Sequence, residues 1–221
     1  MSKGKWDRIM KILLLEDDTF ILEQVKNYFE LDDHTVDCYI DGQTLLDNAI
    51  LQTYDIFLLD INTPVKNGFE TLQEIRKLNI HTPAIFLTAM SDIDHVKKGY
   101  EVGCNDYVRK PFILDELSLR IMQLLHKSKV VQIDENYKFD MQTLELFYND
   151  ECVVLNKQEK DLLYFLLKHK GKPVDPDILI DYIWEDKGVC TNTLRTQIKK
   201  LRAKLKNNFI ENIRNVGYII R

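Results

Sequence analysis

The feature that most constrains the fold is an alternation of short apolar runs with amphipathic segments along residues 12–125. The runs are apolar almost throughout, which is typical of strands buried on both faces of a parallel sheet. The segments between them repeat apolar residues at helical spacing. This pattern predicts an α/β domain, a doubly wound, five-stranded parallel sheet with helices on both faces. The expected strands are 12–15, 35–40, 55–59, 84–87 and 107–108, and the expected helices are 20–31, 44–51, 69–78, 96–102 and 114–125.

Beyond residue 127 the pattern changes to short strands followed by three helical segments. Asn156 and Glu159 have the spacing of a capping box at the start of the first of these helices. Thr191 or Asn192 is expected to cap the third helix. The last segment is expected to be a hairpin with its turn at Gly217-Tyr218. The expected elements are short strands within 130–154, helices at 157–169, 177–184 and from about 191 to 207, and the hairpin at 210–221.

These two patterns predict a first domain at 10–127, a linker at 128–131 and a second domain at 132–221. The four cysteines are scattered, with no C-x-x-C pair, so neither a disulfide framework nor a zinc site is indicated. A reducing, cytoplasmic setting is expected. The apolar run near the start is too short for a membrane span, and no membrane partner is expected.

Charge is distributed unevenly between the two parts of the chain. Residues 1–130 carry 15 Lys and Arg against 21 Asp and Glu, whereas residues 131–221 carry 15 against 14. Within 188–221 there are eight basic residues and one acid, Glu211. A local excess of this kind indicates a polyanionic partner. The alternative is an ordinary solvated basic helix.

Five residues with suitable chemistry stand at the expected strand ends. Side chains at the carboxyl ends of parallel strands meet at one edge of the sheet. Three carboxylates gathered there repel one another unless a cation is shared, and oxygen ligands of this kind favour Mg²⁺. A carboxylate beside Mg²⁺ is a suitable nucleophile toward a phosphoryl group, which a lysine and a hydroxyl would stabilise. The alternative is that each acid merely marks a strand reaching the surface. The residues are Glu16, Asp17, Asp60, Thr88 and Lys110.

Four motifs in the first part resemble response-regulator receiver domains. Residues 12–18 (ILLLEDD) are similar to the opening strand of that family. Residues 58–68 (LLDINTPVKNG) are similar to its phosphorylation loop, with Pro and Gly four and eight residues after Asp60. Residues 86–89 (FLTA) and 106–112 (DYVRKPF) complete the set. The resemblance covers roughly 10–127 and implies a flavodoxin/CheY-like fold.

The receiver resemblance implies a role for each matching residue around Asp60. Asp60 would accept phosphate from a sensor histidine kinase. Asp60, Asp17 and the backbone carbonyl of Asn62 would bind Mg²⁺, with Glu16 acting mainly through water. The Asn62 side chain lies where the family tunes hydrolysis of the acyl phosphate. The chain is then not an enzyme beyond Mg²⁺-dependent self-phosphorylation and slow autodephosphorylation.

The same resemblance implies a switch and a phosphate contact. Thr88 and Tyr107 would be the switch pair, with Thr88 moving toward the phosphoryl group and the Tyr107 ring swinging inward. Lys110 would form a salt bridge with the phosphate. The peptide bond between Lys110 and Pro111 is expected to be cis.

The segment 191–206 predicts a helix with one apolar and one basic face, as in a recognition helix. Together with other segments, this helix resembles the winged-helix effector of the OmpR/PhoB family. These segments are residues 154–163, Trp184, residues 201–205 and residues 213–218, which end in Gly-Tyr. The resemblance implies binding to double-stranded promoter DNA, with RNA polymerase as a candidate further partner. The apolar stripe is Leu194, Ile198, Leu201 and Leu205. Thr193 is an expected DNA contact. Arg195, Thr196 and Lys199 are expected toward base edges, Lys200, Arg202 and Lys206 toward phosphates, and Arg214, in a strand of the wing, toward a minor groove.

The family resemblance also implies a homodimer formed through the receiver on activation. Asp106 and Arg120 stand where an inter-subunit salt bridge is found, and Glu116 matches a further acidic partner. Val96 replaces the usual basic partner of Glu116, so Lys97 would have to substitute. Dimerisation places two effectors on adjacent half-sites and so strengthens binding.

Three alternatives remain from the sequence. An aspartate-nucleophile phosphatase of the haloacid-dehalogenase type also uses Asp, Lys and Mg²⁺, but it has its nucleophile on the first strand in a D-x-D motif, whereas Asp60 is on the third strand and is followed by Asn62. A receiver that acts through protein contacts alone would not bind DNA in a salt-dependent way. A phosphorylation-independent regulator does not fit the complete set of phosphorylation residues.

Overall fold

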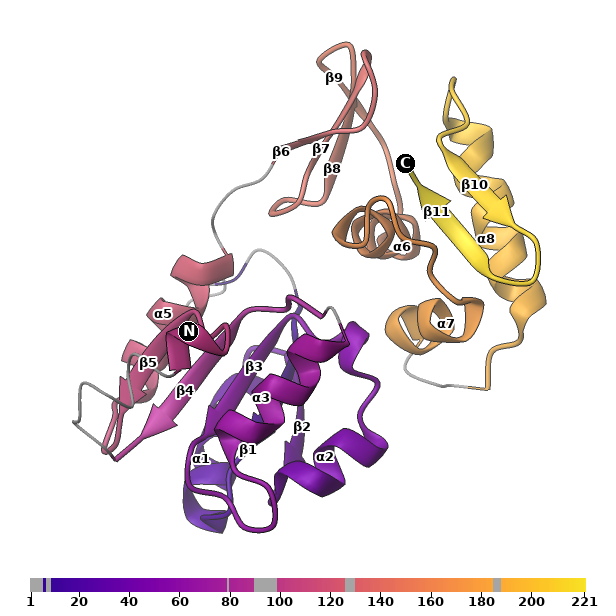
Figure 1. The fold of residues 1–221 in the computed structure, drawn as a ribbon. Helices are drawn as coiled ribbons and strands as arrows, with labels where there is room; N and C mark the ends of the chain where they lie inside the picture. The colour runs from indigo at the N-terminus through magenta and orange to yellow at the C-terminus, as the bar shows by residue number, and fades with distance from the viewer. Residues whose placement is uncertain (1–5, 7–8, 79, 90–98, 126–129, 185–187) are drawn as a thin grey trace. The chain divides into compact units, whose positions relative to one another are not determined.

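The computed structural model describes residues 6, 9–78, 80–89, 99–125, 130–184 and 188–221. The chain divides into two compact units, Met1–Lys127 and Ser128–Arg221 (Figure 1). Part of the junction, 126–129, lies outside the described residues. The limits 10–127, 128–131 and 132–221 therefore remain predictions.

The first unit is built on a five-stranded parallel sheet in the order β2-β1-β3-β4-β5, as predicted. The central pairing of β1 with β3 sets Leu15 beside Leu59. From β1 the chain goes to one edge strand, β2, and then returns past β1 to β3, so the strand order reverses there and a binding site forms at the carboxyl ends. The strands are β1 Lys11–Leu15, β2 Thr35–Tyr39, β3 Ile56–Asp60, β4 Ala84–Thr88 and β5 Asp106–Arg109.

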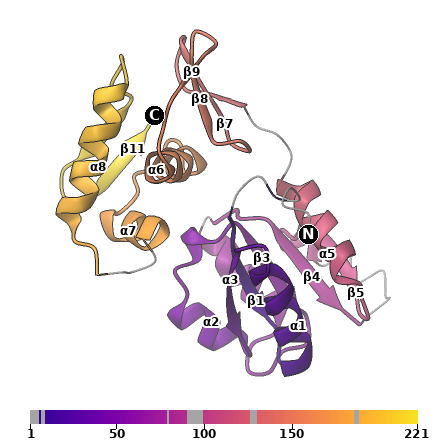
Figure 2. The same cartoon turned by 180° about the vertical axis from the view of Figure 1, so that it is seen from behind.

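Helices cover both faces of this sheet, which confirms the doubly wound architecture (Figures 1 and 2). Ile12 and Leu14 point into one core with α1 and α5, whereas Leu13 and Leu15 point into the other with α2 and α3. This alternation is why the strands are apolar at nearly every position. The helices are α1 Thr19–Glu30, α2 Gly42–Asn48, α3 Gly68–Lys77 and α5 Leu114–Leu125, with a 3₁₀ turn η1 at Leu51–Thr53.

The helices expected at 44–51 and 96–102 are each found in part. The helix expected at 44–51 begins earlier, at Gly42, because the Asp41 carboxylate accepts the Thr44 N–H and caps it. It ends at Asn48, and a separate 3₁₀ turn follows. Of the helix expected at 96–102, residues 99–101 are helical, and 96–98 lie outside the described residues.

The second unit combines a four-stranded antiparallel sheet, three helices and a two-stranded hairpin. The helices and the hairpin share a single apolar core with side chains of the sheet. Gly217 fixes how the hairpin joins this core, because a Cβ there would lie 1.9 Å from the Val174 carbonyl oxygen. The elements are β6 Val130–Gln132, β7 Tyr137–Asp140, β8 Glu145–Tyr148, β9 Glu151–Val153, α6 Lys157–Lys168, α7 Pro176–Trp184, α8 Thr191–Lys204, β10 Ile210–Ile213 and β11 Gly217–Ile220.

One of the two helix caps predicted in this unit is present, and the other lies at a different residue. The capping box of Asn156 and Glu159 is confirmed, with both reciprocal hydrogen bonds present. The cap of α8 was predicted wrongly, because the N-cap residue is Cys190, whereas Thr191 and Asn192 already lie in the helix. The helix ends at Lys204 and does not continue to 207.

The turn of the hairpin was also predicted wrongly. Ile213 pairs with Gly217, so the turn is 214–216 and Gly217-Tyr218 opens the second strand. Asn215, with φ +62°, supplies the left-handed conformation that the turn needs. Arg214 consequently lies in the turn of the wing and not in a strand.

Within the parts of the chain that the structure describes, no helix has both the length and the apolar character required to cross a membrane.

Candidate functional site

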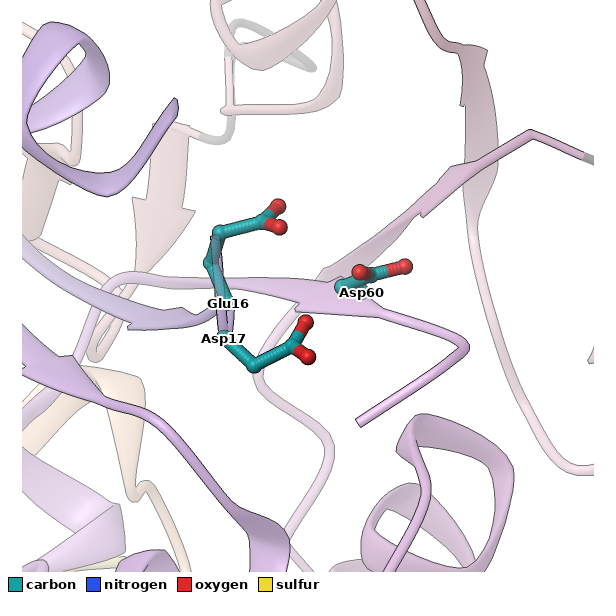
Figure 3. Close-up of side chains that lie close together, drawn as sticks. All are labelled: Glu16, Asp17 and Asp60. Carbon is teal, nitrogen blue, oxygen red and sulfur yellow. The ribbon is translucent and has the colours of Figure 1, made fainter. Parts of the chain in front are cut away.

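Three carboxylates meet at the carboxyl end of the first sheet (Figure 3). Glu16 and Asp17 directly follow β1, and Asp60 ends the neighbouring β3. One carboxylate oxygen from each lies within 4.8 Å of the others. Glu16 and Asp60 are buried, and Asp17 is exposed. The site therefore has one open, solvated side.

Lys110, the residue directly after β5, joins this cluster. Its Nζ lies 2.8 Å from Asp60 Oδ2 and 2.6 Å from Glu16 Oε2. Its backbone N–H donates to the Thr88 carbonyl at 2.8 Å, which fixes the residue at the end of the sheet. The peptide bond between Lys110 and Pro111 is cis, as predicted. Glu16 and Lys110, which are 94 positions apart in the sequence, are thus in direct contact.

The electrostatics of the cluster fit a bound divalent cation. Burial raises the pKa of Glu16 to about 7, and the nearby charge of Asp60 adds to this, while the hydrogen bond from Lys110 opposes it. Burial lowers the pKa of Lys110, but hydrogen bonds to Asp60 and Glu16 outweigh it, and the net pKa is raised. Lys110 Nζ contacts both Glu16 oxygens, at 2.7 Å from Oε1 and 2.6 Å from Oε2, while the Glu16 side chain is fully buried. Three carboxylates and one ammonium leave negative charge that a hard cation would neutralise.

The loop after Asp60 holds this residue from its other oxygen. The Asn62 backbone N–H donates to Asp60 Oδ1 at 3.2 Å, while the Asn62 side chain is exposed. Asp18, the third acid of the first run, is not part of the cluster. Its carboxylate instead accepts N–H groups of Phe20 and Ile21 as the N-cap of α1.

Thr88 and Tyr107 lie on the neighbouring strands β4 and β5. Thr88 is buried at the end of β4. The Tyr107 ring packs against Phe86 and Tyr100, with centroids 5.5 and 5.4 Å apart. Its hydroxyl occupies the position that a Cβ of residue 99 would take, so Gly99 makes room for the ring. Gly99 could not be predicted from the sequence, because its contact with Tyr107 depends on tertiary packing.

The residues predicted for a dimer face also meet one another, within one chain. The Arg120 guanidinium donates to Asp106 Oδ2 at 3.0 Å and to Glu116 Oε1 at 2.8 Å. These two hydrogen bonds raise the pKa of Arg120. Val96 and Lys97, considered for the remaining contact, lie outside the described residues.

Helix α8 has the two faces that its sequence predicts. Its apolar stripe is buried, which confirms the spacing argument. The Thr196 hydroxyl donates to the Asn192 carbonyl, and the Arg195 guanidinium donates to the Asn192 side chain. The exposed residues of the predicted DNA surface are Thr193, Arg195, Thr196, Lys199, Lys200, Lys206 and Arg214.

Two residues predicted to contact phosphates have partners within the second unit. Arg202 is half-buried and donates to the Ile210 carbonyl of β10 at 2.6 Å. Lys206 Nζ lies 4.0 Å from the centre of the Tyr148 ring. Contact with DNA would require both side chains to exchange these partners, so their DNA role stays a prediction.

Comparison with known proteins identifies both units. Residues 12–122 match the family model of the response regulator receiver domain. Residues 150–220 match that of the transcriptional regulatory protein, C terminal. The two matches fall one in each compact unit.

Several known proteins are similar to this chain over nearly their whole length. The transcriptional regulatory protein CrdR of Helicobacter pylori is 33% identical, over 94% of this chain and 96% of its own length. The transcriptional regulatory protein CiaR of Streptococcus pneumoniae is 34% identical, over 96% and 99%. The structure of the response regulator DrrB, a Thermotoga maritima OmpR/PhoB homologue, is 29% identical, covers 96% of this chain and 99% of its own, and has a TM-score of 0.50.

The chain therefore belongs to the OmpR/PhoB family of response regulators. It is a phosphorylation-controlled transcriptional regulator and not a classical enzyme. Its two domains imply a histidine kinase and DNA as partners.

Proposed function

We propose that Asp60 is the residue that accepts a phosphoryl group from a sensor histidine kinase. The observation that supports this most directly is the contact of Lys110 with Asp60 beside two further carboxylates. Asp60 is held at Oδ1 by the Asn62 N–H and at Oδ2 by Lys110, so its carboxylate is oriented before the donor arrives. An Asp60 oxygen attacks the phosphorus atom, and the bond from phosphorus to the donor histidine nitrogen breaks.

The residues around Asp60 fit a Mg²⁺ site formed by Asp17, Asp60 and the backbone carbonyl of Asn62, with Glu16 acting through water. Bound Mg²⁺ would supply positive charge for the phosphoryl oxygens. Asp17, exposed at the open side, gives the ion access. Lys110 neutralises a phosphoryl oxygen, and the Thr88 hydroxyl donates a hydrogen bond to another. Asn62 presents its carboxamide where it can orient the water that hydrolyses the acyl phosphate.

Phosphorylation is coupled to the rest of the chain through Thr88 and Tyr107. Movement of Thr88 toward the phosphoryl group frees space into which the Tyr107 ring turns. Phosphate need only bias two existing receiver states by a few kcal/mol. The state so favoured forms a homodimer through Lys97, Asp106, Glu116 and Arg120. Arg120 would then exchange its partners within the chain for partners in the second copy.

The dimer binds promoter DNA through α8 and the wing, which places this function in the cytoplasm. Thr193, Arg195, Thr196 and Lys199 lie toward the base edges, and Lys200 contacts a phosphate. Arg214, exposed in the wing turn, reaches a minor groove. RNA polymerase is the candidate partner of the DNA-bound form.

One experiment tests this proposal as a whole. Full-length protein is incubated with acetyl phosphate and Mg²⁺, and its intact mass, sedimentation and binding to duplexes selected from a random-sequence pool are measured. We expect a gain of one phosphoryl group, dimerisation and tighter DNA binding. Asp60→Ala should lose all three responses, and Asp17→Asn should lose them in large part. Phosphorylation that persists in Asp60→Ala would rule out this acceptor.

A further inference from the structure

Lys204, in the last turn of α8, makes contacts that differ from those expected of a basic residue on a DNA-binding helix. Its Nζ lies 2.6 Å from Glu159 Oε2 and 3.2 Å from the Val154 carbonyl oxygen. Both partners belong to the start of α6 and the residues just before it. The ammonium of Lys204 is therefore directed at the neighbouring helix of its own domain.

Glu159, the partner of Lys204, is a buried carboxylate. Its side chain is only 1% exposed, and a buried carboxylate without hydrogen bonds is strongly unfavourable. The same Oε2 atom also accepts the Asn156 N–H at 2.9 Å, as the capping box requires. One oxygen thus joins the start of α6 to the end of α8. Loss of Lys204 would leave the buried Glu159 carboxylate poorly compensated, whereas the Lys204 side chain is 39% exposed.

A second contact joins the same two helices about two turns closer to the DNA-reading residues. Gln197 Nε2 donates to Gln158 Oε1 at 2.6 Å. Gln158 and Glu159 are adjacent in the first turn of α6, whereas Gln197 and Lys204 are two turns apart along α8. Two tethers separated along a helix fix its direction as well as its position.

We propose that Lys204 and Glu159 are positioning residues that set the orientation of α8 for sequence-specific DNA recognition, and that Lys204 does not contact DNA. The inference rests on the proposed DNA-binding function. Base readout requires side chains held within about 0.5 Å of their productive geometry. Thr193, Arg195, Thr196 and Lys199 precede Lys204 on a single rigid helix, so a change at its end moves all of them together. Attraction to phosphates tolerates such a movement far better.

Two variants separate this role from a direct phosphate contact. Glu159→Gln removes the negative partner and so raises the net charge of the domain by one, and Lys204→Met removes the ammonium. Binding of the full-length protein is measured against a duplex selected from a random-sequence pool and against poly(dI-dC), over a series of salt concentrations. Lys200→Met serves as the matched control, because Lys200 lies on the same helix, is exposed, and is proposed to contact a phosphate.

For both positioning variants we expect tenfold or greater loss of binding to the selected duplex, little change on poly(dI-dC), and an unchanged salt slope. Lys200→Met should instead weaken both duplexes alike and reduce the slope by about 0.9. The decisive result is Glu159→Gln, since a more positive protein is expected to bind its specific site less well.

Three outcomes would overturn the inference. A slope reduced by about 0.9 in Lys204→Met would make Lys204 a phosphate contact. Unchanged discrimination in Glu159→Gln would show that the pair is not needed for orientation. A third outcome is an equal loss of binding on both duplexes that is explained by a smaller folded fraction, measured by urea unfolding. The pair would then have a role in stability only. Failure of the unmodified protein to bind any selected duplex would instead refute the proposed function itself.

Discussion

The acidic cluster takes its residues from the ends of separate strands, whereas the DNA-reading residues follow one another along a single helix. Glu16, Asp60 and Lys110 are held by buried contacts in which each charge depends on another. The basic residues of α8 that are proposed to read bases, Arg195 and Lys199, are exposed, and each can act alone. Substitutions should therefore act cooperatively in the first region and nearly additively in the second. Four predictions test this contrast, and they run from the largest expected effect to the smallest.

Removal of Lys110 should have the largest effect. Lys110→Met leaves Glu16 and Asp60 without their ammonium partner, and we expect a 100-fold or greater loss of phosphorylation rate with acetyl phosphate. Breaking a buried pair typically costs about 3 kcal/mol of unfolding free energy, less where Glu16 takes up a proton. Lys200→Ala should change stability by less than about 0.5 kcal/mol. Urea unfolding measures the stability of both variants, and incubation with acetyl phosphate measures their phosphorylation rates. Similar small changes in Lys110→Met and Lys200→Ala would contradict the expected difference between the two regions.

The residues that form each of the two regions could be predicted from the sequence. That Glu16, Asp17, Asp60 and Lys110 lie together could be predicted because each stands at or just after the carboxyl end of a strand, and parallel strands bring such ends together. The buried stripe of α8 follows from its spacing alone.

Contacts between helix ends were not predictable in the same way. Nothing in the local sequence pairs Lys204 with Glu159, which lie 45 residues apart. The cap of α8 is Cys190, although two better capping residues follow it. The turn of the wing was misplaced because Gly217 is needed for its closeness to Val174 and not for a turn.

Single charges on α8 should have the next largest effects. Lys199→Ala and Arg195→Ala are each expected to reduce binding to a selected duplex by about tenfold, since a good base contact is worth about 1–3 kcal/mol. The double variant should lose close to the product of the two factors. Fluorescence anisotropy with the selected duplex measures this. A double variant no weaker than either single one would mean that these residues act as a unit, as those of the acidic cluster do.

The pH dependence of Mg²⁺ binding tests the acidic cluster more finely. With a Glu16 pKa of about 7, the proton must leave before the carboxylate can help hold the ion, so affinity should rise by about tenfold between pH 6 and 8. Without metal, the free energy of unfolding should fall as the pH rises, which is opposite in sign to the change in Mg²⁺ affinity. The pKa is raised from 4.5, so this contribution to stability is present below pH 4.5 and is lost as the pH rises through about 7.

Titration calorimetry with Mg²⁺ at several pH values measures the first effect, and urea unfolding the second. Glu16→Gln cannot release the proton, so it should lose most of the pH dependence in both. A variant that retains the unmodified protein's profile would assign the titration to another group.

The smallest effect is expected at Asn62, whose side chain is exposed and whose backbone alone holds Asp60. If the carboxamide orients the attacking water, Asn62→Ala should lengthen the lifetime of the phosphoryl group several-fold. Its formation rate should stay within about twofold, because the residue 62 backbone N–H that orients Asp60 is kept. The lifetime is followed by intact mass after the phosphodonor is removed. Asn62→Asp is the matched comparison, since it keeps the shape and adds a charge to the cluster. Equal lifetimes in Asn62→Ala and the unmodified protein would show that water is positioned by other groups, and the contact of Asn62 with this site would then be confined to its backbone.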